Sequence, residues 1–293
     1  TIKKARSQNI DNSRLDIKNK QLQNSTALGN VEQCAQELAL DNGLNNFKYS
    51  ANNPQAVVER VNDIKPFGMH KGINDFIATV YIYIPKQDIV ISQDGKFTAR
   101  EYYGMSIKQT GESFENWSER IGGVYFDNFE NEHSYFNGQR ILETIEYKQS
   151  YPFGANPAGT IVIVIDYNAF NRFCGNVDLG DKSLFVVDKK DKVIYRAGSE
   201  KHELRREYID MDASAVSKMM SSTVVFKSEN DGYKFISVEQ SNELNRNLGG
   251  ILLFDFVCIL VFLFVGFLIC FYMAYNASDP LMKLEKVITR YGE

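Results

Sequence analysis

The sequence predicts an α+β protein: a long N-terminal helix, two modules built on antiparallel sheets, and one transmembrane helix. Three observations predict this order. An apolar stripe repeats every seven residues near the N-terminus, alternating apolar runs separated by turn residues fill the middle, and an uninterrupted apolar run lies near the C-terminus. The expected divisions are a long N-terminal helix (1–45), a membrane-distal module (46–170), a membrane-proximal module (171–240), a connector (241–250), a transmembrane helix (251–275) and the start of a cytoplasmic juxtamembrane helix (276–293).

The N-terminal segment, residues 1–45, contains no proline and is expected to form one helix. The positions spaced by seven are Ile10, Ile17, Asn24, Val31 and Leu38, and the second position of the repeat is filled by Leu28 and Ala35. This stripe suits a homodimer with Leu28, Val31 and Leu38 in the seam between two paired helices. It suits equally a helix that packs on the chain's own sheet, so both alternatives stay open.

The membrane-distal module shows strand and helix patterns in alternation. Phe76 to Ile84 alternates apolar and polar residues, and Asp94-Gly95 is typical of a hairpin turn. The run Ile161 to Ile165 is apolar on both faces, which predicts a central strand. The expected helices are Pro54 to Ile64 and Ser113 to Ile121, and the expected strands are Phe76 to Ile84, Asp88 to Ser92, Lys96 to Tyr103, Ile141 to Tyr151 and Gly159 to Tyr167.

The membrane-proximal module repeats this pattern on a smaller scale. Its last two strands are joined across Asp231-Gly232, again a hairpin signal. The expected strands are Leu184 to Asp188, Val193 to Tyr195, Val224 to Lys227 and Tyr233 to Val238, with a short helix from Ser214 to Met220 and a connecting helix from Ser241 to Leu248.

Residues Ile251 to Tyr275 form a run of 25 residues with a single charge, Asp255. As a helix this run is about 37 Å long, enough to cross a hydrocarbon core of about 30 Å. Basic residues slightly favour the C-terminal side, with Lys283, Lys286 and Arg290 after the run and Lys234 and Arg246 before it. This predicts a cytoplasmic C-terminus. Because the chain starts at Thr1 and stops within an amphipathic segment, we expect a fragment that lacks an N-terminal span and an output domain.

Composition argues against several functions. The net charge is −4 and 13% of residues are aromatic, which does not suit a nucleic-acid binder. Phosphate-loop, dinucleotide, metalloprotease and serine-hydrolase motifs are absent, so we expect no enzyme and no cofactor. The histidines stand apart in sequence, and the acidic run from Glu130 to Glu132 is interpreted as a solvated loop. Cys34 and Cys174 are either one disulfide or two buried thiols.

Two short segments carry a resemblance to a known family. The segment Phe76 to Tyr103 contains Tyr83, Pro85, Asp88, Val90, Ile91, Ser92 and Gly95 in the pattern Y-x-P-x-x-D-x-V-I-S-x-x-G. This pattern resembles the distal module of double Cache extracellular sensor domains, as found in membrane-bound AraC-type transcription regulators of Gram-positive bacteria. Pro280 and Leu284, after the apolar run, resemble the Pro-x-x-x-Leu segment of those regulators and of related sensor histidine kinases. The resemblance implies two PAS-like modules with antiparallel sheets outside the cell.

The resemblance also implies a ligand site in the distal module. Asp166 matches the Asp that follows a buried strand in amino-acid-binding members. The Arg-x-Trp-Tyr stretch of those members does not match, and the nearest residues of the same types are Trp117, Arg120 and Tyr125. We therefore expect a small polar ligand (an amino acid, an amine or a sugar) contacted by Asp166 and Arg120, with aromatic walls from Tyr103, Trp117 and Tyr125. Asp166 is equally compatible with a role inside the protein's own structure.

Two classes of function remain open. In the first, the chain is the sensing and signal-transmitting part of a homodimeric receptor, with residues 1–248 extracellular and the C-terminus cytoplasmic. Its output is expected to be an AraC-type helix-turn-helix regulator, with a histidine kinase as the alternative. In the second, the chain is a membrane-anchored adhesion or assembly domain without a small ligand. A pocket lined by the predicted residues favours the first class, and a filled interior with a large exposed apolar patch favours the second.

Overall fold

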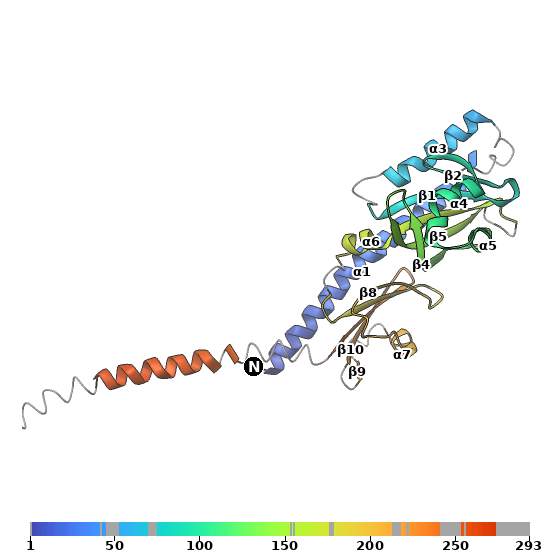
Figure 1. Cartoon of the computed structure of the whole chain (residues 1–293). Helices are drawn as coiled ribbons and strands as arrows, with labels where there is room; N and C mark the ends of the chain where they lie inside the picture. The colour runs from blue at the N-terminus through green and yellow to red at the C-terminus, as the bar shows by residue number, and fades with distance from the viewer. Residues whose placement is uncertain are drawn as a thin grey trace, which may run out of the picture. The chain divides into compact units, whose positions relative to one another are not determined.

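The computed structural model describes residues 2–41, 43–44, 53–69, 75–152, 154, 156–175, 179–212, 218–220, 223–240, 253–254 and 256–273. It divides into two compact units, residues 11–240 and residues 1–10 with 241–293. Two antiparallel sheets with accompanying helices make up the first unit, which confirms the α+β class (Figure 1). The connector predicted at 241–250 and the tail predicted at 276–293 lie outside the described residues.

The first sheet has six strands in the spatial order β3-β2-β1-β6-β5-β4, all antiparallel to their neighbours. β6 lies between β1 and β5 and is buried along its whole length, which confirms the predicted central strand. The strands are β1 (Ile77–Ile84), β2 (Ile89–Ser92), β3 (Gly95–Thr98), β4 (Asn128–Phe136), β5 (Ile141–Tyr151) and β6 (Gly159–Asp166).

Two short helices cover one face of this sheet. α4 (Ala99–Ser106) and α5 (Phe114–Ile121) bury Tyr102 and Trp117 against alternate residues of β1 and β6. α4 starts with a capping box in which the Thr98 side chain accepts from the Glu101 amide and Glu101 accepts from the Thr98 amide. The helical turns η1 (Pro85–Gln87) and η2 (Lys108–Thr110) lie in the connections, while α3 (Pro54–Met69) packs against β1, β2 and β3 and α6 (Tyr167–Phe173) follows β6.

The second sheet has five strands in the order β8-β7-β11-β10-β9. The β10–β11 hairpin turns at Asp231 and Gly232, both with positive φ, as the sequence predicted for this Asp-Gly pair. The elements are β7 (Ser183–Val187), β8 (Val193–Gly198), α7 (Arg206–Ile209), β9 (Lys218–Met220), β10 (Thr223–Asn230) and β11 (Tyr233–Gln240).

The long helix α1 (Ile2–Leu40) is joined to the second sheet by side-chain hydrogen bonds. Gln21 and Ser25 bond to Ser228 and Asn230 of β10, and Glu32 accepts from Tyr233 of β11. The predicted seam residues Leu28, Val31 and Leu38 are all buried within a single chain. They therefore pack on the core of their own chain, which is the second of the two alternatives that the sequence left open. A seam between two chains would have to use another face of α1.

Three segments differ from their predictions. Ala99 to Tyr103 is helical rather than a continuation of strand β3. Lys218 to Met220, predicted as the end of a helix, is the edge strand β9, and the preceding residues 213–217 lie outside the described part. The acidic run at Glu130, interpreted as a loop, belongs to strand β4.

The second unit contains the apolar helix that the sequence predicted. The window Phe256–Met273 has 18 residues, a mean hydropathy of 2.9 and none of its surface buried in the structure. By length and composition it is long enough to cross a membrane. Cys34 and Cys174 of the first unit are two buried thiols, and burial raises their pKa to about 11 and about 12.

Candidate functional site

Strand β5 carries two charged residues on the face that α4 and α5 cover. Side chains alternate along a strand, so Leu142, Thr144, Glu146 and Lys148 share one face, and Leu142 packs in the same core as Trp117. Glu146 is 1% exposed and Lys148 is fully buried. Because buried charges are costly unless they are paired, their partners define the site.

The partner of Glu146 is Arg120, which lies in the last turn of α5. The guanidinium group forms an ion pair with Glu146 and donates two further hydrogen bonds of 2.9 Å to the carboxylate of Glu112. Burial acts to lower the pKa of Arg120, but the hydrogen bonds to Glu112 and the charge of Glu146 hold it above its ordinary value. Arg120 thus stays charged and fastens α5 to β5.

Lys148 pairs with Glu130 of the neighbouring strand β4. Its ammonium group donates to Glu130 and lies 4.5 Å from the ring centre of Tyr125. Burial lowers the pKa of Lys148, although the bond to Glu130 opposes that effect. Burial acts to raise the pKa of Glu130, but bonds from His133 and Lys148 outweigh it and hold that pKa well below its ordinary value.

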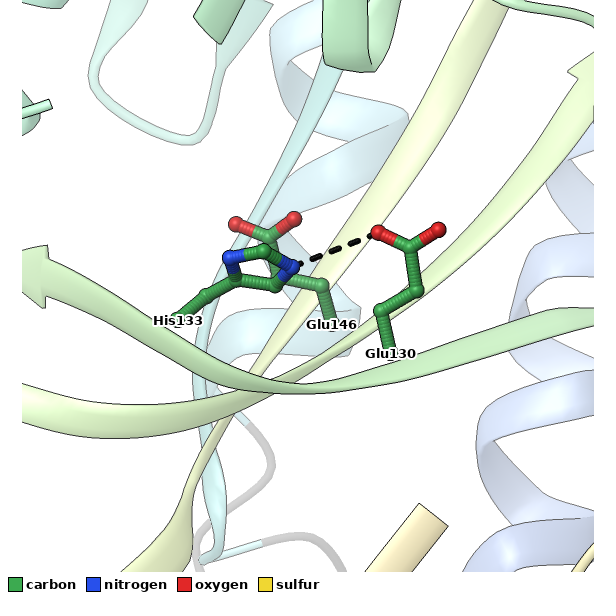
Figure 2. A group of neighbouring side chains, drawn as sticks. All are labelled: Glu130, His133 and Glu146. Carbon is green, nitrogen blue, oxygen red and sulfur yellow. Dashed lines mark hydrogen bonds and ion pairs between the residues drawn. The ribbon is translucent and has the colours of Figure 1, made fainter. Parts of the chain in front are cut away.

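His133 joins this group because β4 is irregular between Glu130 and His133. The extra residue of the irregularity places both side chains on the same face, with His133 Nε2 3.3 Å from Glu130 Oε2. Ligand atoms of Glu130, His133 and Glu146 all lie within 4.8 Å of one another (Figure 2). This set could hold a metal ion, but Lys148 and Arg120 already neutralise the two carboxylates, so a divalent cation would have to displace a buried ammonium group.

We call Glu112, Arg120, Glu130, His133, Glu146 and Lys148 the charged cluster. Apart from the imidazole of His133, three carboxylates face two cationic side chains, Arg120 and Lys148, which leaves one negative charge in excess. Next to it, the hydroxyl of Tyr81 and the indole nitrogen of Trp117 are both buried and interact with each other. Burial, followed by the charge of Glu146, raises the pKa of Tyr81 well above its ordinary value. The site therefore combines a charge deficit with two buried polar groups.

Four of the five predicted site residues lie together in this region. Tyr103 packs 6.0 Å from Trp117, ring centre to ring centre, and donates a 2.7 Å bond to the carbonyl of Glu112. Tyr125 donates to the carbonyl of Arg120. Trp117 itself is completely buried in the aromatic core, so in this structure it fills the interior rather than lining a pocket.

Asp166 lies apart from the other four, at the end of β6. Its carboxylate accepts a 3.0 Å bond from the Ala169 amide and so caps α6, and Arg140 approaches it at 3.7 Å. Its contacts among the described residues are thus with the protein itself, the structural role that the sequence left open.

Sequence reasoning missed most of the charged cluster. Glu130 and His133 were assigned to a loop and to an isolated histidine, although both lie on β4 next to β5. One signal was readable: Glu146 and Lys148 are two residues apart on a predicted strand that adjoins the apolar run of β6. Charged residues alternating on such a strand indicate that partners must come from elsewhere in the fold.

Comparisons with known proteins show similarity in fold only. No family model matches the chain, and no curated protein matches it. Among solved structures, the chain is similar to the sensory domain of the Campylobacter jejuni chemoreceptor Tlp3 with isoleucine bound, with 10% identity, a TM-score of 0.40, and 83% of this chain and 97% of that chain covered. It is also similar to the sensor domain of the V. cholerae histidine kinase DctB, with 11% identity, a TM-score of 0.46, and 80% and 98% covered. A third similar structure is the extracellular domain of the histidine kinase vpHK1S-Z8, with 9% identity, a TM-score of 0.48, and 84% and 96% covered.

Proposed function

We propose that this chain is the ligand-sensing and membrane-spanning part of a bacterial receptor. The observation that carries the proposal is the charged cluster, an ionic network with one unbalanced negative charge on the covered face of the first sheet. Such a network is a poor way to stabilise a core, because apolar residues of the same volume usually do as well or better. The same chain also carries an apolar helix of membrane-spanning length, which suits recognition followed by transmission.

The charge deficit indicates the chemistry of the ligand. A ligand with an ammonium group would supply the missing positive charge and could contact the face of Tyr125, as the ammonium group of Lys148 does. Amines and amino acids fit this requirement, whereas a neutral sugar would leave the deficit unchanged. The small polar ligand expected from the sequence is thereby narrowed to a cationic or zwitterionic one.

The remaining parts of the proposal follow from the sequence. Residues 1–248 would lie outside the cell and 276–293 inside, because basic residues are slightly more frequent after the apolar run. The output domain would be an AraC-type helix-turn-helix regulator, and a histidine kinase fits the same sensor equally well. The segment itself would contact a membrane, a small ligand and a second copy of the chain, but no nucleic acid.

The tight interior around Trp117 favours the second class, a membrane-anchored adhesion or assembly domain without a small ligand. Such a domain would use exposed apolar side chains, and Val124 and Phe126 are two of them, each about half exposed. This alternative gives no role to the buried charges of β5. The binding experiment described next separates the two functions.

The test uses the full chain in lipid nanodiscs. Trp117 is the only tryptophan in the sequence, so its fluorescence reports on the charged cluster directly during thermal unfolding. Amino acids, amines and sugars are screened, and a ligand at a hundred times its Kd should stabilise the chain by about 2.7 kcal/mol. Glu112→Gln removes the excess negative charge at a partly exposed position and should weaken amine binding about tenfold or more. Glu115→Gln, on the exposed side of α5, is the matched control.

Two results would contradict the sensor function. One is a screen in which no compound changes the unfolding of the chain. The other is a ligand that binds Glu112→Gln as tightly as the unchanged chain, since binding would then be independent of the charge deficit.

A further inference from the structure

We propose a second ligand site, between the two sheets, for a small zwitterion whose ammonium group binds Glu143 and whose carboxylate binds Arg196. It goes beyond the proposed sensing site because its charged walls belong to different sheets. The site is a pocket of about 430 Å³, here called the inter-sheet pocket, lined by Asn131, His133, Ser134, Glu143, Thr144, Tyr167 and Arg196.

The topology explains why a pocket forms at this position. β4 is an edge strand of the first sheet and β8 is an edge strand of the second, and the two edges are in contact. Twisted sheets that meet at their edges cannot fill the space between them with regular side-chain packing. The volume falls within the range of about 300–1,000 Å³ that is usual for small-molecule sites.

The walls of the pocket carry opposite charges. Glu143 comes from β5 and is exposed, and Arg196 comes from β8 of the other sheet. Tyr167 lies within electrostatic reach of both: after the effect of burial, the charge of Glu143 raises the pKa of Tyr167 and the charge of Arg196 lowers it. Opposite charges on facing walls favour a ligand that has one charge of each sign.

Arg196 is held in place without losing its charge. Its guanidinium group donates to the carbonyls of Ser199 at 3.3 Å and His202 at 3.2 Å, and it lies 5.6 Å from the ring centre of Phe185. Carbonyls fix the guanidinium group but do not neutralise it. A positioned cation of this kind binds a carboxylate well, since little side-chain entropy is lost on binding.

A buried polar atom supports the same conclusion. Thr144, which lines the pocket, has a buried hydroxyl without a hydrogen-bond partner among the described residues. A polar group of a ligand would satisfy it, and a buried hydroxyl left without a partner destabilises the fold. His133 belongs both to this pocket and to the charged cluster, so a ligand here would contact the edge of the sensing site.

The test is calorimetric titration of the full chain in nanodiscs with a defined series: glycine, β-alanine, γ-aminobutyrate, putrescine and succinate. At least one of the three zwitterions should bind, more tightly than the diamine or the dicarboxylate. Glu143→Gln should weaken that binding about tenfold or more, and Glu143→Asp should restore part of it. Glu119→Gln, an exposed change on α5, should have no effect. Because Glu143 is exposed, these variants are expected to fold.

The proposal is overturned if no zwitterion of the series binds, or if Glu143→Gln binds it as tightly as the unchanged chain. Its failure is distinguishable from failure of the sensing function. Glu112→Gln changes a charge of the charged cluster, whereas Glu143→Gln changes a charge of the inter-sheet pocket and none of the charged cluster.

Discussion

Tyr233 of β11 donates a hydrogen bond to the carboxyl group of Glu32 on α1, and so joins the long helix to the second sheet. Asp127, which precedes β4, lies close enough to Glu32 to act on it electrostatically, and it accepts a 3.2 Å bond from Tyr147. Lys189, between β7 and β8, pairs with Asp127 at 3.4 Å. The helix and both sheets therefore meet at this group of charged and phenolic side chains.

The first prediction is that this junction weakens as the pH rises through neutrality. Burial, opposed by the bond from Tyr233 and assisted by the charge of Asp127, raises the pKa of Glu32 from 4.5 to about 7. The folded chain thus binds the proton more tightly than the unfolded chain, so this contribution is complete below pH 4.5 and is lost as the pH rises through about 7. The expected loss is about 1–2 kcal/mol after allowance for partial exposure.

Thermal unfolding between pH 5 and pH 8 measures this loss. Glu32→Gln, which mimics the protonated form, should flatten the profile over that range. Glu37→Gln, an exposed change on the same helix, should leave the profile as it is. An unchanged profile in Glu32→Gln would show that the pH dependence arises elsewhere.

The second prediction concerns self-association through α1. Because Leu28 is buried within one chain, Leu28→Asp should destabilise the fold by about 4 kcal/mol or more, as expected for an unpaired charge in a core. Leu15 and Leu22 are spaced by seven and are 60% and 65% exposed, so we expect a homodimer of this chain to use them as its seam. Leu22→Asp should lower the sedimentation-measured dimer fraction without a change in Tm. If the dimer fraction is unchanged in Leu22→Asp, the contact between the two chains lies on another surface.

The third prediction concerns the ion pair of Arg120 and Glu146. Arg120→Met leaves two carboxylates without their cation and should destabilise the chain by about 3–5 kcal/mol. Arg140→Met is the control, because this arginine is 67% exposed and its pair with Asp166 is worth less than about 1 kcal/mol. Denaturant unfolding followed by Trp117 fluorescence gives both values. Equal effects of the two substitutions would mean that the ion pair of Arg120 and Glu146 contributes no more to the free energy of unfolding than an ion pair on the surface.

The elements that the sequence predicted correctly are those with strong local patterns. The alternation of β1 and the Asp-Gly turn before β11 needed no knowledge of distant partners. Strand β4 was missed because Asn, Glu and His dominate it, and only pairing with β5 makes it a strand. Helix α4 was missed although Thr98 and Glu101 form a capping box that is readable in the sequence.

Part of the candidate site was also predictable from local sequence patterns. Residue type and position indicated Arg120, which belongs to the charged cluster, and Trp117, which lies one turn before it on α5. The partner of Arg120 could not be predicted, because Glu146 lies 26 residues away and reaches it only through the order of the strands. Asp166 has the residue type of a ligand contact, but its position before α6 gives it a capping role.

The last prediction tests the proposed topology in intact cells. A cysteine in place of Lys190, an exposed residue between β7 and β8, should react with a membrane-impermeant maleimide, whereas a cysteine in place of Lys286 should not. Background labelling from Cys34 and Cys174 should be low, since both are buried and burial raises the pKa of both thiols above 10. The other two cysteines, Cys258 and Cys270, lie within the apolar run, where the bilayer would shield them from an impermeant reagent. Permeabilised cells provide the control, because both substituted positions should then react. The reverse pattern in intact cells would place the two sheets inside the cell and would contradict an extracellular sensor.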